Sequence, residues 1–173
     1  MSETAKNPTS DFGHVFGFWL LRLWLSVRAI LAGVEKYAGT ETSDEVVDIG
    51  GSPNEYGLTA SGSEKVYGLD QYSGVPRALY DKFLDEPLVS EFALNLYDTA
   101  LGPALILVGL GLLFGIATRL SLFAMGLIYI SLTGGLILLK QDAGVAWLGI
   151  HIILVAFALM NVQHNRLAIL KKC

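Results

Sequence analysis

The sequence has 173 residues, of which 53% are hydrophobic and only 16% are charged, and its formal net charge is −4. Soluble domains carry about 25% charged residues, so this composition is typical of a single membrane domain. No basic stripe is interleaved with aromatic residues, which argues against nucleic-acid binding. The one cysteine, Cys173, excludes an internal disulfide and any cysteine-based metal cluster.

The first apolar segment, residues 12–34, predicts a membrane helix. About 20 residues of α-helix cross the roughly 30 Å of hydrocarbon in a bilayer. Arg22 and Arg28 lie inside this segment, and Arg22 is expected to point toward another helix or a partner. No small-residue cleavage site stands out after the segment, so we interpret it as a retained signal anchor.

A long connection, residues 37–90, follows the first span. Its first half is acidic and rich in glycine and serine, which indicates a loop. Within residues 75–84, the apolar residues Val75, Leu79 and Phe83 recur at a spacing of four. We expect a short amphipathic helix there, on the membrane surface or over the bundle, and a partly ordered loop is the alternative.

Three further apolar segments, residues 99–118, 120–139 and 143–163, also predict membrane spans, and the helix of the first of these could start earlier, near Glu91. The first two contain no charged residue, and the third has His151 as its only ionisable group. The joints between them are short, so neighbouring helices must run antiparallel. The predicted fold class is therefore all-α: a polytopic four-helix transmembrane bundle with one long loop between the first two helices.

Lysine and arginine near the span ends predict the orientation of the chain. The positive residues on the side that holds both termini are Lys6, Arg119, Arg166, Lys171 and Lys172. In the long loop, acidic residues outnumber the basic ones. We expect a chain integral to the inner (plasma) membrane, with both termini in the cytoplasm and the long loop periplasmic or extracellular.

Five ionisable residues form a candidate site in the outer half of the bundle. Charge inside a bilayer is costly, so such a residue indicates function by default. At about 1.5 Å per helical residue, Arg28 lies roughly 10 Å and His151 roughly 13 Å below the outer ends of their spans. Glu35 and Lys36 close the first span, and Asp98 lies at the mouth of the second. The five side chains are expected to gather at similar depth.

This polar cluster has two interpretations. In the first, Arg28 and His151 hydrogen-bond the carbonyl oxygens of a quinone, His151 exchanges a proton, and Glu35 or Asp98 completes a path to the outer side. The aromatic candidates for packing on the quinone ring are Trp147, Tyr97 and Tyr129. In the second, Arg28 pairs with Asp98 or Glu35 to dock the helices, and His151 is a neutral core residue. The residues alone favour the second interpretation, and no metal or haem is expected.

Two stretches resemble the DoxX/DoxD-like membrane proteins. Residues 21–36 are an arginine-bearing apolar helix that ends in Gly33-Val34-Glu35-Lys36, similar to the family's first helix and its Gly-x-x-Lys element. Residues 115–120, Gly-Ile-Ala-Thr-Arg-Leu, are similar to its joint between helices two and three. The long loop is not covered. The resemblance implies a four-helix membrane bundle and places Arg28 and Lys36 on motif positions.

The resemblance also implies a function. The DoxD branch is the large membrane subunit of a thiosulfate:quinone oxidoreductase and works with a second, DoxA-type subunit. By analogy, this chain would bind quinone, receive electrons from a periplasmic donor, and contact partner subunits on the outer side or in the membrane. The alternative is a non-catalytic scaffold or assembly subunit whose long loop docks the partner. A transporter is less favoured because the spans show no inverted repeat.

Overall fold

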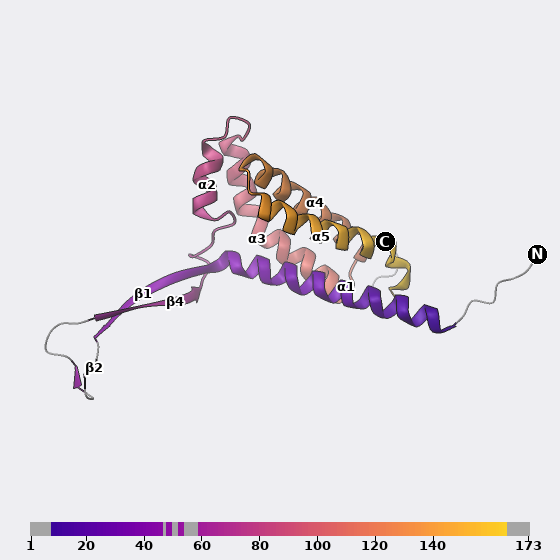
Figure 1. Ribbon diagram of the computed structural model, residues 1–173, viewed down its shortest axis with the longest axis horizontal. Coiled ribbons are helices and arrows are strands. Elements are labelled where there is room, and N and C mark those ends of the chain that lie inside the picture. The colour runs from indigo at the N-terminus through magenta and orange to yellow at the C-terminus, as the bar shows by residue number, and fades with distance from the viewer. Residues whose placement is uncertain (1–7, 47, 50–51, 54–58, 166–173) are drawn as a thin grey trace, which may run out of the picture.

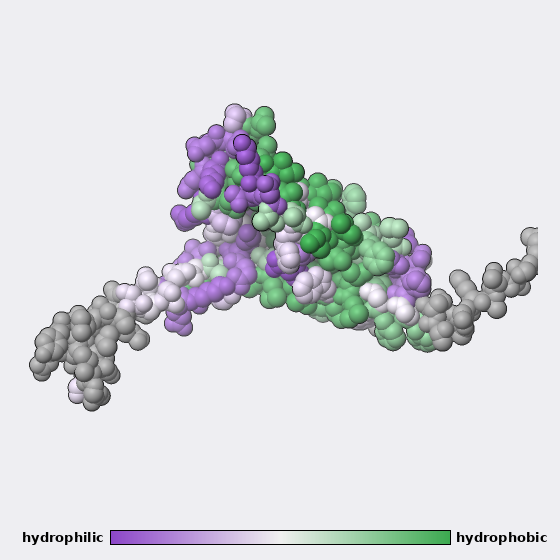
Figure 2. Space-filling model, in the orientation of Figure 1, coloured by the Kyte–Doolittle hydropathy of each residue, from purple (hydrophilic) through white to green (hydrophobic). Residues whose placement is uncertain are grey.

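Four long helices dominate the computed structural model, which describes residues 8–46, 48–49, 52–53 and 59–165 (Figure 1). They are α1 (Pro8–Val34), α3 (Glu91–Phe114), α4 (Thr118–Leu138) and α5 (Asp142–Met160). Each is long and apolar enough to cross a membrane, as the sequence predicts. A hydrophobic belt covers the bundle between hydrophilic residues at its two ends (Figure 2), as expected for a protein whose helices lie in lipid.

Helix α3 begins at Glu91, so the helix of the second span starts ahead of its apolar run at residue 99, as the sequence indicates. Ser90 is extended and its carbonyl accepts the first helical bond, from the Leu94 amide at 2.9 Å. The carboxylate of Glu91 then lies in the first turn, where the helix dipole favours negative charge. The polar turns before the apolar run are thus helical too, although the Ser90 side chain forms no capping hydrogen bond.

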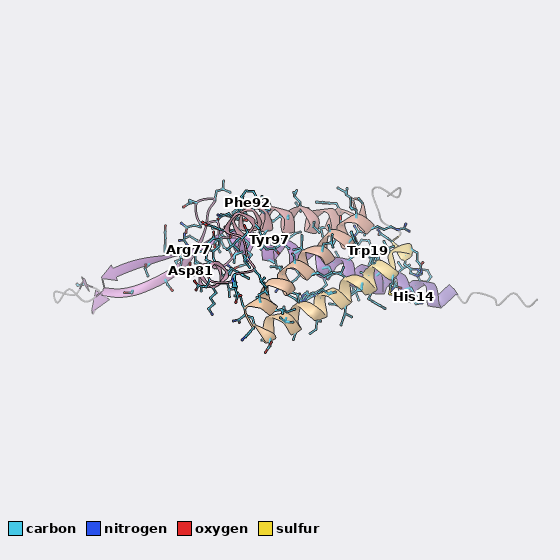
Figure 3. The ribbon with its side chains drawn as sticks, turned by 90° about the horizontal axis from the view of Figure 1, so that it is seen from above. His14, Trp19, Arg77, Asp81, Phe92 and Tyr97 are labelled. Atoms are coloured by element: carbon cyan, nitrogen blue, oxygen red, sulfur yellow. The ribbon has the colours of Figure 1, made fainter. Side chains whose placement is uncertain are left out.

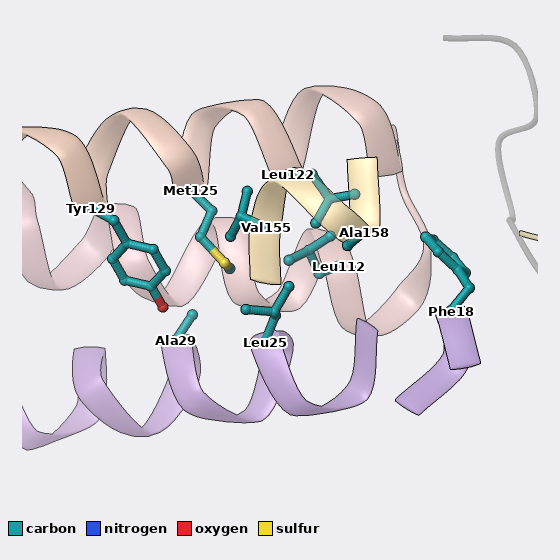
Figure 4. Close-up of a cluster of buried hydrophobic side chains, with 9 residues drawn as sticks. All are labelled: Phe18, Leu25, Ala29, Leu112, Leu122, Met125, Tyr129, Val155 and Ala158. Carbon is teal, nitrogen blue, oxygen red and sulfur yellow. The ribbon is translucent and has the colours of Figure 1, made fainter. Parts of the chain in front are cut away.

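The four helices form a wedge (Figure 1). Helix α1 packs along α3, and α4 packs along α5. The two pairs meet at the end that holds the α3–α4 connection, here called the joint end, and diverge toward the opposite end. The hydrophobic core lies in the joint half (Figure 4) and consists of Phe18, Leu25, Ala29, Leu112, Leu122, Met125, Tyr129, Val155 and Ala158. The diverging half therefore contains space that the core does not fill.

Arg22 closes the joint end of α3. Its guanidinium is buried and donates from Nε to the Leu112 carbonyl (2.6 Å) and from Nη2 to the Leu113 carbonyl (2.9 Å). The last carbonyls of a helix lack partners within the helix, and the dipole there favours a cation. Nη1 donates to the side-chain oxygen of Asn165 (3.0 Å), whose amide in turn donates to Thr118 at the start of α4 (2.9 Å). The expectation that Arg22 points toward another helix is confirmed.

Glycines let α1 and α3 approach closely. A Cβ on Gly109 would lie 2.7 Å from Cγ1 of Ile30 and 3.0 Å from the Ser26 carbonyl oxygen. A Cβ on Gly33 would lie 2.6 Å from Cγ1 of Ile106. Small residues at helix crossings allow this separation in membranes, where van der Waals contact drives helix association. The α1/α3 pair is therefore held by contacts that only glycine permits.

Gly109→Ala is expected to destabilise the protein by about 1–3 kcal/mol, because overpacking forces the two helices apart. Thermal unfolding in a detergent of fixed concentration measures the loss. Gly149→Ala is the matched control, because a Cβ on Gly149 meets nothing within 4 Å. Alanine at that helical position should leave stability unchanged or slightly raised. Equal melting temperatures for the two variants would contradict the close packing.

A β-hairpin extends from the diverging end, which we call the hairpin end (Figure 1). Strand β1 (Ala38–Val46) pairs antiparallel with β4 (Thr59–Tyr67), from Ala38 opposite Tyr67 to Val46 opposite Thr59. Strands β2 (Asp48–Ile49) and β3 (Ser52–Pro53) pair beyond it. This small sheet corrects the all-α prediction. The segment lacks the alternation of apolar and polar residues that indicates a strand, because neither face of the ribbon packs on a core.

The short helix α2 (Arg77–Leu84) lies across the hairpin end, where the sequence predicts an amphipathic helix over residues 75–84. Its labelled residues Arg77 and Asp81 lie at the same end as Tyr97, far from His14 and Trp19 at the joint end (Figure 3). The α2 segment therefore covers the open side of the wedge.

Tyr72, in the connection before α2, compensates for a proline inside α3. Pro103 has no amide hydrogen, so the Thr99 carbonyl loses its helical donor. The Tyr72 hydroxyl donates to the carbonyls of Asp98 (2.5 Å) and Thr99 (3.0 Å) and accepts from the Gly102 amide (3.2 Å). Burial is the main cause that raises the pKa of the Tyr72 phenol above its ordinary value. The connection is thereby attached to α3 beside the cavities described next.

Candidate functional site

The open half of the wedge contains two adjoining cavities. The smaller, about 170 Å³, lies among α1, α3, α4 and α5, and its polar and aromatic walls are Arg28, Lys36, Tyr129, Trp147 and His151. We call it the polar chamber. The larger, about 530 Å³, lies under α2 and is almost entirely apolar, and we call it the apolar chamber. Three of the five predicted site residues, Arg28, Lys36 and His151, thus line one cavity.

His151 presents an unpartnered nitrogen to the polar chamber. The residue is 3% exposed, and Nδ1 lies 2.9 Å from the Trp147 carbonyl. That carbonyl can only accept, so Nδ1 carries the hydrogen and Nε2 of the neutral ring is an acceptor. Nε2 is buried and has no hydrogen-bond partner among the described residues. Buried polar atoms are nearly always paired, so this atom indicates an occupant that donates a hydrogen bond.

Two aromatic rings hold the His151 imidazole in place. Tyr129 meets it edge-on at 5.6 Å between ring centroids, and Trp147 lies at 5.3 Å with a tilt of 57°. Both rings also line the polar chamber. The third aromatic candidate, Tyr97, lies on the apolar chamber instead, where its hydroxyl bonds to Ser131. Any ring bound beside His151 would therefore contact Tyr129 and Trp147.

Arg28 supplies a cation to the same chamber. Its half-buried side chain forms no hydrogen bond or ion pair with any residue that the structure describes. The expected docking pair of Arg28 with Asp98 or Glu35 is not formed, because both carboxylates have other partners. A charge inside a membrane protein normally pairs or faces a cavity, and here it faces the cavity.

Lys36 lies where the two chambers meet. It belongs to a short 3₁₀ turn, Glu35–Tyr37, that continues α1, and its carbonyl accepts a hydrogen bond from the Ser73 amide at 2.7 Å. Its side chain lines both chambers. Within the described part of the chain, its ammonium group has no hydrogen-bond partner, although Asp98 attracts it electrostatically. Lys36 is thus a second cation available to an occupant.

Asp98 lies just outside the polar chamber. Its Oδ1 accepts a hydrogen bond from the Val75 amide at 2.5 Å. The residue lines a third cavity of about 360 Å³ with polar walls, together with Tyr72 and Arg77 of the α2 region. Asp98 therefore lines the third cavity and not the polar chamber, contrary to expectation, and it interacts with Lys36 only electrostatically.

Glu35 is not part of the site, contrary to expectation. Its carboxylate accepts hydrogen bonds from Lys65 Nζ (2.5 Å) and the Tyr67 hydroxyl (2.9 Å) at the base of the hairpin. The bond to Glu35 is the main cause that raises the pKa of Lys65. Both side chains are about half exposed, so the pair contributes little stability. Glu35 follows Arg28 by seven residues, a spacing that would place both on one face of a continuous helix. The α-helix ends at Val34, however, and the 3₁₀ turn directs the Glu35 side chain toward the hairpin.

Tyr72 was missed from the sequence. The signal that indicates it is Pro103, since a proline inside a helix leaves a carbonyl that needs an outside donor. A Cβ on Gly102 would lie 2.6 Å from the Tyr72 ring and 3.3 Å from Cβ of Lys36, so Tyr72 and Lys36 pack on the same turn of α3. Tyr72 therefore lies beside the residue of α3 on which Lys36 packs.

Comparison with protein families, with curated proteins and with solved structures finds no match for this chain.

Proposed function

We propose that this chain is a DoxX/DoxD-like integral membrane subunit of an oxidoreductase complex that binds a quinone head group in the polar chamber. The observation that carries the proposal is the buried Nε2 of His151, which has no hydrogen-bond partner among the described residues and lies on one cavity with the cations Arg28 and Lys36. A quinol offers a hydroxyl to Nε2, and the oxygens of either redox form accept from the cations. Only a group that both donates and accepts satisfies all three residues.

The size of the chamber supports a single ring. An apolar cavity of about 150 Å³ accepts one benzene molecule, and the polar chamber is about 170 Å³. Tyr129 and Trp147 supply aromatic contacts on its walls. A benzoquinone ring bound there would have its oxygens near the charged groups and its faces near carbon.

The proposed reaction is the two-electron reduction of quinone to quinol. The electrons come from a donor of the thiosulfate type and are delivered through a partner subunit on the outer side. The two protons reach the quinone oxygens through His151, with Asp98 as a relay toward the polar third cavity. In this proposal the termini are cytoplasmic, the hairpin faces outward, and the membrane is the inner one.

A second candidate function, a scaffold for a larger complex, is favoured by one observation. The hairpin extends away from the bundle as a two-stranded ribbon (Figure 1). Isolated two-stranded hairpins are marginally stable in water, so this ribbon would gain stability from a partner. Both functions predict a partner subunit, and quinone binding separates them.

His151→Phe is expected to weaken binding of a quinol about five- to tenfold and to change quinone binding less, because only the quinol donates to Nε2. Phenylalanine keeps an aromatic ring between Tyr129 and Trp147. The measurement is quenching of Trp147 fluorescence by chain-free quinone and quinol. Trp19 and Trp24 are replaced by phenylalanine, so that Trp147 is the only tryptophan.

The same titration decides between the candidate functions. Saturable quenching, together with native quinone in an organic extract of gently purified protein, supports the oxidoreductase subunit. If no quinone is extracted and neither redox form quenches Trp147 saturably, the polar chamber does not bind quinone and the scaffold function replaces it.

A further inference from the structure

The apolar chamber is not used by the head-group site, although the two cavities adjoin. Its walls come from the α2 segment, including Val75, Leu79 and Phe83, and from the facing sides of α3, α4 and α5. At about 530 Å³ it is three times the volume of the polar chamber. A space of this size lined by carbon inside a bilayer needs a hydrophobic occupant, because the lining atoms otherwise lose their contacts.

Among the described wall residues of the chamber, the indole N–H of Trp147 is the one neutral side-chain donor without a hydrogen-bond partner. Tyr97 and Ser131 bond to each other at 2.8 Å, and the Ser131 hydroxyl also donates to the Ile128 carbonyl at 2.8 Å. Lys36 is the charged residue on its wall, and it lies at the boundary with the polar chamber. Water needs two to four polar partners to occupy a cavity, so a hydrocarbon chain is the better occupant.

The two chambers share part of their walls. The residues that line both are Lys36, Leu101, Leu132, Trp147 and Leu148. A molecule with a polar ring and an apolar chain could therefore occupy both at once, with Lys36 beside their junction. A phospholipid fits less well, because the polar chamber has room for one ring but not for a head group with its glycerol.

We infer that the apolar chamber binds the isoprenoid chain of the quinone, so that the substrate is a chain-bearing quinone whose first isoprene units lie under α2. This inference rests on the proposed function, because the ring in the polar chamber is what directs the chain. Leu79 and Phe83 of α2 then contact the chain directly. Lipid tails are as apolar as leucine, so the chain gains packing contacts and not transfer free energy on leaving the bilayer.

The test compares two ligands on the full chain in lipid nanodiscs: a chain-free benzoquinone and the same ring with two isoprene units. Affinities are measured by Trp147 quenching and expressed per mole of lipid, so that partitioning into the bilayer cancels. The chain-bearing ligand is expected to bind about tenfold more tightly, as filling a void with carbon contacts predicts. Ala93→Phe, which fills the apolar chamber, should abolish this preference while the chain-free ring binds as before.

Ala156→Phe is the matched control. Ala156 is exposed on α5 and does not line either chamber, so the same substitution there should keep the tenfold preference. Retained binding of the chain-free ring shows that Ala93→Phe is folded. Three results would overturn the inference without affecting the head-group site. The unmodified protein could bind the two ligands equally, or the preference for the chain-bearing ligand could survive in Ala93→Phe. A fatty acid without a ring could also compete with the chain-bearing ligand as well as that ligand competes with itself. Failure of the chain-free ring to bind would instead remove the proposed function itself.

Discussion

Arg28→Ala is expected to lower affinity for a quinone head group by about 10- to 100-fold, because a hydrogen bond to a charged group contributes about 1.5–3 kcal/mol. The guanidinium faces the polar chamber and forms no bond or ion pair with the described residues. Stability should therefore be unchanged or slightly raised, since the substitution removes an uncompensated charge from the membrane interior. The measurements are Trp147 quenching and thermal unfolding of the same preparation.

Two controls sharpen this prediction. Arg119→Ala removes an exposed arginine outside both chambers and should leave affinity unchanged. Arg28→Lys keeps the charge but loses the planar fork of donors, so intermediate affinity is expected. If Arg28→Ala loses much stability and head-group binding is unchanged, Arg28 docks the helices. That result would contradict the proposal that Arg28 binds the quinone.

Arg22→Leu is expected to have the opposite profile: a loss of about 3–5 kcal/mol of stability, the cost of breaking a buried charged network. Leucine keeps the apolar stem but leaves the carbonyls of Leu112 and Leu113 and the side chain of Asn165 without this donor. These groups close α3 and attach it to the start of α4. The measurements are thermal unfolding and the monodisperse fraction by size exclusion.

Asn165→Ala provides the partner for a double-mutant cycle with Arg22→Leu. The two residues share one network, so their effects should be clearly less than additive. Arg22→Lys should recover only part of the stability, because one ammonium group cannot match the fork that reaches three acceptors. Full stability in Arg22→Leu would show that the network does not hold the joint end together.

The two arginines of α1 thus have different roles, although they lie six residues apart in one apolar segment. Hydropathy marks both as costly and depth places both in the bilayer. Arg22 donates to the carbonyls of Leu112 and Leu113 at the end of α3, while Arg28 lines a cavity. The end of α3 at Phe114, followed by Gly115 with φ of 70°, supplies those carbonyls. Two residues of the Gly-x-x-Thr-Arg-Leu joint contribute to this network. Gly115 ends α3, and the Thr118 hydroxyl accepts a hydrogen bond from Asn165.

Much of the membrane part follows from residue order. Four apolar stretches of about 20 residues predict four spans, because helical rise and hydrocarbon thickness are constants. The hairpin could not be predicted in this way, because its strands are polar on both faces and the ladder alone defines them. The sequence does not predict the wedge shape either. Short joints determine that neighbouring helices are antiparallel, but not the angle at which they cross.

By itself, the sequence determines that four segments are long and apolar enough to cross a bilayer, and it predicts a similar depth for Arg28 and His151, since both depend only on composition and on distance along a helix. Only the tertiary structure decides which of these groups have partners. Glu35 turns to the hairpin, Asp98 binds the Val75 amide, and Nε2 of His151 stays unpaired. Whether a polar side chain has a hydrogen-bond partner depends on which side chains of other segments lie next to it. The residue pattern along one helix does not determine those contacts.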